Sequence, residues 1–264
     1  MPTIRSRVLH IYTETAVHAG GSESVGGIDL PIQRETATQL PLIWGQSLRG
    51  ALRSLVSNTD GDLATRLFGS GPTKASTDDS TQAGNVFVGD ARLLAFPVAT
   101  LQRTFAWATS PLCLGRVGRL PRQSATNPWD SIPTPTNDGG CGTEGWKEKQ
   151  VLGAYQVTVT TNDSVAVAAA SLANTLPSFN GFQPVREKAA KDLLVVTDEL
   201  LKNLAIEGTD MVTRVKLDNK KQVEQLFVEE YLPSETFLAA PLGFLCSSED
   251  ESEFVRLISS GANP

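Results

Sequence analysis

Glycines and one aspartate stand close together between residues 18 and 35. The glycines at 20–21 and 26–27 let the backbone reach left-handed conformations and approach a ligand closely. They place Asp29 at the exit of a flexible loop, where its carboxylate could take a proton or help to hold a divalent ion. An aspartate that caps its own turn is the ordinary structural alternative, and the sequence alone favours it.

A second candidate is the start of a helix shortly after this loop. Residues 39–44 predict a short strand, and Gly45 opens a helix whose apolar side carries leucine and alanine. Gln46 and Ser47 lie beside the free N–H groups of the first turn, and Arg49 and Arg53 share another face, so the segment could cradle a phosphate. A capped surface helix with two solvated arginines is the alternative that the sequence alone favours.

Composition places the chain among ordinary globular proteins. Its 264 residues are 40% hydrophobic and 20% charged, which favours one elaborated domain over two. No apolar run approaches the roughly 18 residues that span a bilayer, and the first residues lack the apolar core of a signal peptide, so we expect a cytoplasmic protein without a membrane partner. Three widely spaced cysteines and two histidines suggest neither disulfides nor a histidine metal cluster.

The net charge of −6 argues against a polyanionic partner, but the charges are unevenly distributed. Residues 92–122 hold five arginines and no acid, whereas the last twenty residues hold four acids and one arginine. This pattern fits a protein with one basic working face and an acidic back. It equally fits ordinary surface variation.

Hydrophobic patterning predicts a mixture of strands and helices. We expect helical spacing over 188–204, an irregular insertion over 111–150, and extended segments at 4–12, 85–96, 101–109, 151–161 and 165–169. Near the end, Ser248 and Glu251 form a predicted capping box ahead of an apolar stripe, and Gly261 can end that helix.

Residues 211–225 predict a basic hairpin. The run MVTRVKL alternates apolar and polar residues, and Asp218, Asn219 and Lys220 supply a turn. A plain surface hairpin with solvated lysines is the alternative interpretation.

Several motifs together resemble a known family. The chain resembles the RAMP superfamily of CRISPR-associated proteins and, within it, the repeated backbone subunit of type III-B effector complexes. The segments that carry this resemblance appear in the family's order from residue 18 to residue 233 and read HAG, GIDLPIQRE, WGQSLRGALRS, LFG, VGDAR, FPV, FAWATSPL and VEEYLP.

The resemblance implies an α+β fold with a ferredoxin-like (RRM-like) core. It implies a single domain over 1–264 with inserted irregular segments, chiefly about 111–150, and a protruding thumb-like β-hairpin at about 209–225. In the family, a helix like the last one here is normally followed by another strand and a glycine-rich segment. Neither is present, so we expect a truncated or naturally shortened C-terminus.

The resemblance also implies a function. A family member of this kind binds a CRISPR guide RNA, polymerises along it with other copies of itself, joins other subunits of the complex, and cleaves guide-complementary target RNA at regular intervals with Mg²⁺ or Mn²⁺. Asp29 matches the cleaving and metal-holding aspartate, His18 matches a loop histidine near the RNA, and either Glu229 or Glu230 matches an acid near the site.

The same resemblance assigns the RNA contacts. The guide would be held by Gly20, Gln46, Ser47, Arg49, Arg53 and Arg214. Met211 is the candidate wedge, since a flexible apolar side chain can insert between bases. Two alternatives stay open: a catalytically inactive architectural RNA-binding subunit, and the equivalent subunit of a type III-A or III-D complex.

Overall fold

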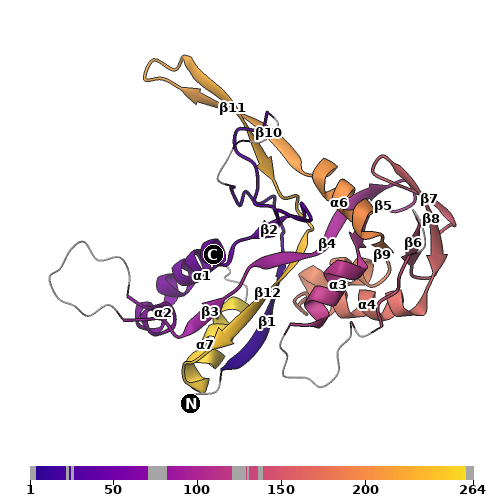
Figure 1. The fold of residues 1–264 in the computed structure, drawn as a ribbon. Coiled ribbons are helices and arrows are strands. Elements are labelled where there is room, and N and C mark those ends of the chain that lie inside the picture. The colour runs from indigo at the N-terminus through magenta and orange to yellow at the C-terminus, as the bar shows by residue number, and fades with distance from the viewer. Residues whose placement is uncertain are drawn as a thin grey trace.

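The computed structural model describes residues 4–21, 24, 27–70, 82–120, 129, 131–135 and 139–259. Within these ranges the chain has a mixed α+β fold with one large sheet and a separate two-stranded hairpin that projects from the rest (Figure 1). The large sheet contains β1 (Arg5–Tyr12), β2 (Leu42–Ile43), β3 (Val86–Val88), β4 (Ala91–Thr100), β5 (Thr104–Thr109), β6 (Gly140–Gly142), β7 (Lys149–Leu152), β8 (Tyr155–Thr161), β9 (Leu193–Val196) and β12 (Phe237–Phe244). The hairpin is β10 (Asp210–Leu217) and β11 (Val223–Tyr231).

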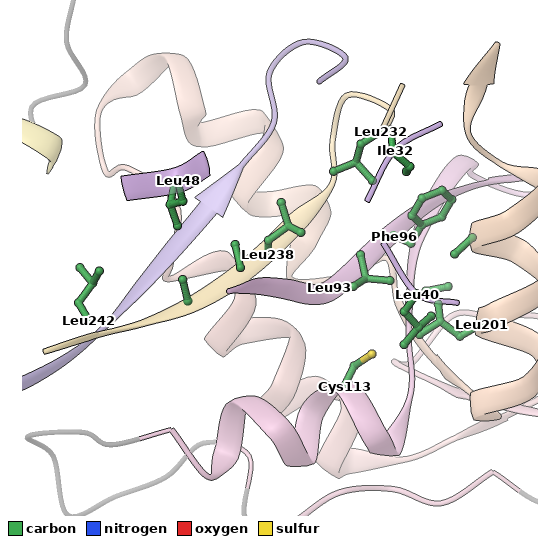
Figure 2. Packing of buried hydrophobic residues seen from close by; sticks show 14 of the residues in the cluster. Ile32, Leu40, Leu48, Leu93, Phe96, Cys113, Leu201, Leu232, Leu238 and Leu242 are labelled. Atoms are coloured by element: carbon green, nitrogen blue, oxygen red, sulfur yellow. The ribbon is translucent and has the colours of Figure 1, made fainter. Parts of the chain in front are cut away.

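Hydrophobic clusters pack on both faces of the large sheet. Its strand order is β1-β12-β4-β5-β9-β6-β8-β7; β5–β9 and β6–β8 are parallel, and the other pairs are antiparallel. Because successive side chains of a strand point to opposite faces, Leu93 joins one hydrophobic cluster and Leu94 the other. Figure 2 shows the first of these clusters, which also holds Ile32 and Leu232. This cluster therefore reaches the segment that follows Asp29.

The described helices are seven α-helices and one short 3₁₀ turn. In α1, Leu48, Leu52 and Val56 recur every fourth residue and are buried, which explains why this helix packs on the sheet. The helices are α1 (Gly45–Thr59), α2 (Gly61–Phe68), α3 (Pro111–Gly118), α4 (Asp163–Ala173), α5 (Gln183–Ala189), α6 (Asp198–Glu207) and α7 (Ser248–Ser259), with η1 at Asn180–Phe182.

The strands expected at 4–12, 85–96, 101–109 and 151–161 are confirmed, but two other expectations are wrong. Residues 165–169 belong to helix α4, whose N-cap Asn162 accepts a hydrogen bond from the N–H of Ser164. The predicted helix over 188–204 is interrupted by β9, a strand whose four residues are all buried. The true helix α6 starts only after Thr197, whose hydroxyl caps it.

The expected irregular insertion at 111–150 also contains regular structure. Pro111–Gly118 form α3, because Ser110 accepts a hydrogen bond from the N–H of Cys113 and proline suits the first helical turn. Strands β6 and the start of β7 follow. Residues 121–128, 130 and 136–138 of this segment, including Arg122, lie outside the described residues, as do Gly26 and Gly261.

The last helix is capped differently from the expected capping box. The Ser247 hydroxyl, not that of Ser248, accepts the hydrogen bond from the N–H of Asp250 at 3.1 Å. Glu251 instead turns inward, is 3% exposed, and pairs with Arg5 and Arg7 of β1. The acid thus fixes α7 to the first strand. No helix in the described part of the chain is long and apolar enough to cross a membrane.

The expected hairpin is present and longer than predicted. It continues to Tyr231 in β11, and every residue of β10 is exposed. Its far end is closed by Asp218, whose carboxylate accepts hydrogen bonds from the N–H groups of Lys220 and Gln222. At its near end β11 runs toward β12 and the large sheet (Figure 1).

Candidate nucleic-acid interface

Asp29 is exposed and is attached to the base of the hairpin. Its Oδ2 accepts a hydrogen bond of 2.8 Å from the backbone N–H of Val228 in β11. The next residue, Leu30, donates to the carbonyl of Val228 and accepts from the N–H of Glu230, so the segment runs beside β11 as a short parallel neighbour. Oδ1 of Asp29 makes no hydrogen bond to the described residues. The carboxylate is therefore oriented by one oxygen and open at the other.

His18 is fixed next to the same strand. Its Nδ1 lies 2.7 Å from the carbonyl oxygen of Glu230. A carbonyl can only accept, so Nδ1 carries the proton and Nε2 is the basic nitrogen. Nε2 faces Gly20, where an added Cβ would lie only 2.9 Å away. The imidazole also contacts the ring of Tyr231, with 5.4 Å between the ring centroids.

Glu229 belongs to a polar network on one face of the hairpin. Its Oε2 accepts from the hydroxyl of Tyr231 at 2.6 Å and from Nε of Arg214 at 3.0 Å, and Arg214 also donates to the Tyr231 oxygen. The Tyr231 hydrogen bond, and after it the Arg214 guanidinium, hold the pKa of Glu229 below its usual value although partial desolvation opposes them. Glu229 is thus a carboxylate at neutral pH, close to His18.

Tyr231 was not singled out from the sequence as a site residue. It stands two residues after Glu229, so the period of the strand puts both side chains on one face. That spacing is the signal that could have found it. This face of the hairpin therefore presents both the aromatic ring of Tyr231 and the guanidinium of Arg214.

Glu230, the other candidate acid, points the opposite way and is only 2% exposed. Its carboxylate accepts from the N–H of Ile32, the guanidinium of Arg34 and the hydroxyl of Thr209. All three donors are protein groups, so this side chain does not face a ligand.

The start of α1 lies close to the same loops. Gln46 and Ser47 are exposed, and the first turn contains no acid of its own, but the carboxylate of Asp90 accepts a hydrogen bond of 2.8 Å from the N–H of Gly45. The buried Gln33 joins this helix start to the loop of His18: its Oε1 accepts from the N–H of Trp44 and its Nε2 donates to the carbonyl of Gly20 at 3.0 Å. The two groups of candidate residues are therefore brought together.

Arg49 and Arg53 turn away from the helix start toward the end of α2. Arg49 donates to the carbonyl of Phe68 at 2.8 Å and lies over its ring, and Arg53 donates to the carbonyl of Ser70. Both are half-buried. Each guanidinium has five N–H donors, so these bonds still leave donors for a phosphate.

Met211 and Arg214 are exposed on the first strand of the hairpin, Met211 at 49%. They occupy opposite faces, with Met211 across from Glu230 and Arg214 across from Phe227. The face of Met211 continues with Val215 and Leu226, both at least half-exposed. The hairpin therefore has one apolar and one charged face.

Three of the arginines of 92–122 are paired with acids and so do not contribute free charge to the basic face that the sequence suggested. Arg92 and Arg116 both approach Glu35, and Arg103 pairs with Asp192. Arg34 and Glu35 likewise pair with other residues and not with one another. Arg92, Arg103 and Arg116 are neutralised by acids distant in the sequence, and counting charges segment by segment does not reveal such pairs.

A preformed metal site is not found in the described ranges, which contain no cluster of three or more His, Cys, Asp or Glu side chains suited to one. Asp29 supplies one open carboxylate oxygen. Mg²⁺ is commonly held by one or two carboxylates together with substrate phosphates. The donor set here fits an ion shared with a phosphate chain better than a resident ion.

Comparison with known proteins identifies the family. The family model of the RAMP superfamily matches residues 10–259. A relative from Pyrococcus furiosus, the CRISPR system Cmr endoribonuclease Cmr4, is 32% identical over 241 residues, covering 88% of this chain and 79% of its own length. A Streptococcus thermophilus relative, the CRISPR system Cms endoribonuclease Csm3, is 33% identical over 31% of this chain and 42% of its own length.

Solved structures agree on the fold. A crystal structure of oligomeric Cmr4 from Pyrococcus furiosus has a TM-score of 0.72 at 23% identity, covering 97% of this chain and 88% of that one. A cryo-EM structure of type III-B Cmr-beta bound to cognate target RNA has a TM-score of 0.71 at 20% identity, covering 97% and 90%. The family match over residues 10–259, together with the 32% identical relative from Pyrococcus furiosus, shows that this chain belongs to the RAMP superfamily.

Proposed function

We propose that the chain is a backbone subunit of a type III-B CRISPR effector complex, which binds a guide RNA and cleaves the target RNA paired with it. The relatives named as endoribonucleases and the similar structure bound to target RNA support this proposal. The observation that carries it is the position of Asp29: an exposed carboxylate with one free oxygen, attached to the base of an exposed hairpin. Other copies of the chain along the guide, and other subunits of the complex, would be its protein partners.

The finer fold assignment belongs to the same proposal. Strands β1, β12 and β4 lie side by side in the sheet, and α1 and α7, from opposite ends of the sequence, both bury side chains in the same hydrophobic cluster. We assign these elements to a ferredoxin-like core and the β10–β11 hairpin to the thumb. The whole chain would then be one domain with insertions.

The guide RNA would lie against the start of α1. Gln46 and Ser47 offer side chains and backbone N–H groups to phosphates there, and Arg49 and Arg53 add positive charge behind them. Gly20 allows close approach of the backbone, and Arg214 reaches the RNA from the hairpin. Met211 would insert between bases as an apolar wedge. Base pairing with the guide reads the sequence, so no base-specific side chain is required.

Cleavage would use the 2′-hydroxyl of the target strand. If the strand is bent so that this hydroxyl lies in line with its own phosphorus, its oxygen attacks, the bond to the 5′ oxygen breaks, and a cyclic phosphate and a free 5′-hydroxyl result. The open oxygen of Asp29 would take the hydroxyl proton, while the Val228 N–H keeps the carboxylate oriented. Glu229 and His18 would shape the electrostatics and position of the strand beside it.

As the alternative to taking the proton, the same oxygen of Asp29 would hold a divalent ion, Mg²⁺ or Mn²⁺, together with RNA phosphates. When bound it would neutralise charge on the phosphate under attack. Since the described residues supply one carboxylate for it, we propose that the ion arrives with the RNA.

The hydrogen bond from Val228 to Asp29 also favours a second candidate, an architectural RNA-binding subunit in which Asp29 only shapes its loop. The partial match to Csm3 likewise keeps the equivalent subunit of a type III-A complex as an alternative, and a type III-D subunit would have the same chemistry. Both alternatives retain the guide-binding surface and differ in activity or in partner subunits.

Two substitutions test whether Asp29 carries out cleavage or only shapes its loop. Asp29→Asn keeps an oxygen that accepts from Val228 but removes the charge, whereas Asp29→Ala removes both. Each variant would be assembled with guide RNA and its partner subunits and given a labelled complementary RNA with Mg²⁺ or Mn²⁺, with a chelator as control. We expect both variants to assemble and neither to cleave.

A matched control is Asp218→Asn, which removes a carboxylate that caps the far end of the hairpin. It should cleave like the wild type. Wild-type complex without any cleavage would support the architectural subunit, and full activity of Asp29→Asn would remove Asp29 from the chemistry.

A further inference from the structure

Glu230 is one of three buried carboxylates in the described chain that are held by arginine; the others are Asp192 and Glu251. A carboxylate is costly to bury unless hydrogen bonds and an opposite charge compensate it. Glu230 has both: Ile32 N–H at 3.0 Å, Thr209 Oγ1 at 2.8 Å, and the Arg34 guanidinium, itself only 15% exposed. The positions of these donors in the chain show which segments the carboxylate connects.

The donors to this carboxylate come from separate segments of the chain. Ile32 ends the loop of Asp29, Arg34 continues from it, and Thr209 immediately precedes the first strand of the hairpin. Arg34 also donates to the carbonyl of Ala205 near the end of α6. One side chain therefore joins the loop, the root of the hairpin and the large body of the protein.

The backbone of the same residue holds two further candidate groups. Its N–H donates to the carbonyl of Leu30 at 3.0 Å, directly after Asp29, and its carbonyl accepts the Nδ1 proton of His18. Val228, two residues earlier, holds the Asp29 carboxylate itself. Asp29 and His18 are thus positioned from two alternate residues of the hairpin strand, Val228 and Glu230.

We propose that Glu230 is a positioning residue, which makes the loop of Asp29 and the root of the hairpin move as one body. This inference rests on the proposed function and adds to it how the cut would be placed: the distance from the point where the hairpin meets the RNA to the bond that is cleaved is set inside one chain. Glu230 does this without touching RNA.

The direct test is Glu230→Gln, which keeps the size and one acceptor but loses the charge that holds Arg34. Misplacing a reacting group by about 1 Å can slow a reaction on the order of a hundredfold, so we expect single-turnover cleavage at saturating target to fall about ten- to a hundredfold. The products should also spread to neighbouring positions. Guide and target binding should stay within about twofold.

A second, milder variant tests the same role if Glu230→Gln does not fold. Thr209→Val has nearly the same shape and removes only the hydroxyl, which donates to Glu230 and, at the longer distance of 3.5 Å, to the carbonyl of Ile206, while the Arg34 ion pair remains. We expect a decrease in rate of about fivefold and a detectable second cut position.

Glu251→Gln is the matched control. Glu251 is as buried as Glu230 and is also held by arginines, but it fixes α7 to β1. It should lower the melting temperature comparably and leave the cut positions of the assembled complex unchanged. If Glu230→Gln instead behaves like this control, or cleaves at wild-type rate and positions, Glu230 is merely structural and the inference is overturned.

Hydrogen exchange of the free chain separates this inference from the proposed function. Glu230→Gln should increase exchange in residues 27–34 and 226–231 together, whereas Glu251→Gln should not. A wild-type complex that does not cleave would refute the proposed function alone. Unchanged exchange in both segments would refute the positioning role whether or not cleavage occurs.

Discussion

Replacing Ile32 with alanine should disturb both stability and cleavage. Ile32 lies three residues after Asp29, is 4% exposed, and packs in the main hydrophobic cluster together with Leu232 (Figure 2). Truncating a buried isoleucine to alanine costs about 2–5 kcal/mol through lost burial and the cavity left behind. With about 2–4 °C per kcal/mol for a chain of this size, a loss near 3 kcal/mol lowers the melting temperature by about 6–12 °C.

A control for the effect on cleavage is a variant that destabilises the same hydrophobic cluster by the same amount at a position away from the loop. Leu63 is 1% exposed in the same cluster but lies in α2, and Leu63→Ala should lower the melting temperature by a similar amount. Thermal melting of the free chain and single-turnover cleavage by the assembled complex would be measured for both. We expect Ile32→Ala alone to slow cleavage at a temperature where both variants are folded. Equal cleavage by the two variants would refute the reasoning that Ile32 anchors the loop.

Three further predictions concern the helix start, the hairpin and the last helix. Trp44 is 41% exposed whereas Trp107, Trp129 and Trp146 are at most 9% exposed, so guide RNA bound at the start of α1 should change tryptophan fluorescence, and Trp44→Phe should abolish the change. The pKa of Glu229 is lowered in the fold, so its contribution to stability is present above the unfolded value of about 4.3 and is lost as the pH falls through the folded value. Glu229→Gln should therefore melt below the wild type at neutral pH and together with it in strong acid. Ser247→Ala should cost about 1 kcal/mol in the unfolding free energy measured in urea, and Ser248→Ala close to nothing, because Ser247 is the cap.

The sequence predicted elements whose signal is local. The first strand, the helix after Gly45 and the alternating hairpin follow from hydrophobic period and turn residues. The strand β9 was missed because it is buried on both faces and so does not alternate, while Leu193 and Val196 happen to continue the spacing of α6.

The sequence named most residues of the candidate site, Tyr231 excepted, but not the contacts between them. Period two puts Glu229 and Glu230 on opposite faces, yet the sequence cannot say which face is buried, because Ile32 and Arg34 lie about two hundred residues away. The hydrogen bond from Val228 to Asp29 could not be predicted for the same reason. The ion pairs of Arg92, Arg103 and Arg116 were hidden for the same reason.

The most direct test of the central claim is the chemistry of the cleavage products. Complexes assembled with wild-type chain and with Asp29→Asn would be incubated with one complementary RNA, and the product ends would be identified by mass spectrometry. We predict regularly spaced wild-type products with cyclic phosphate and 5′-hydroxyl ends, and intact RNA with Asp29→Asn. The same products from both complexes, or wild-type products with 3′-hydroxyl and 5′-phosphate ends, would contradict it.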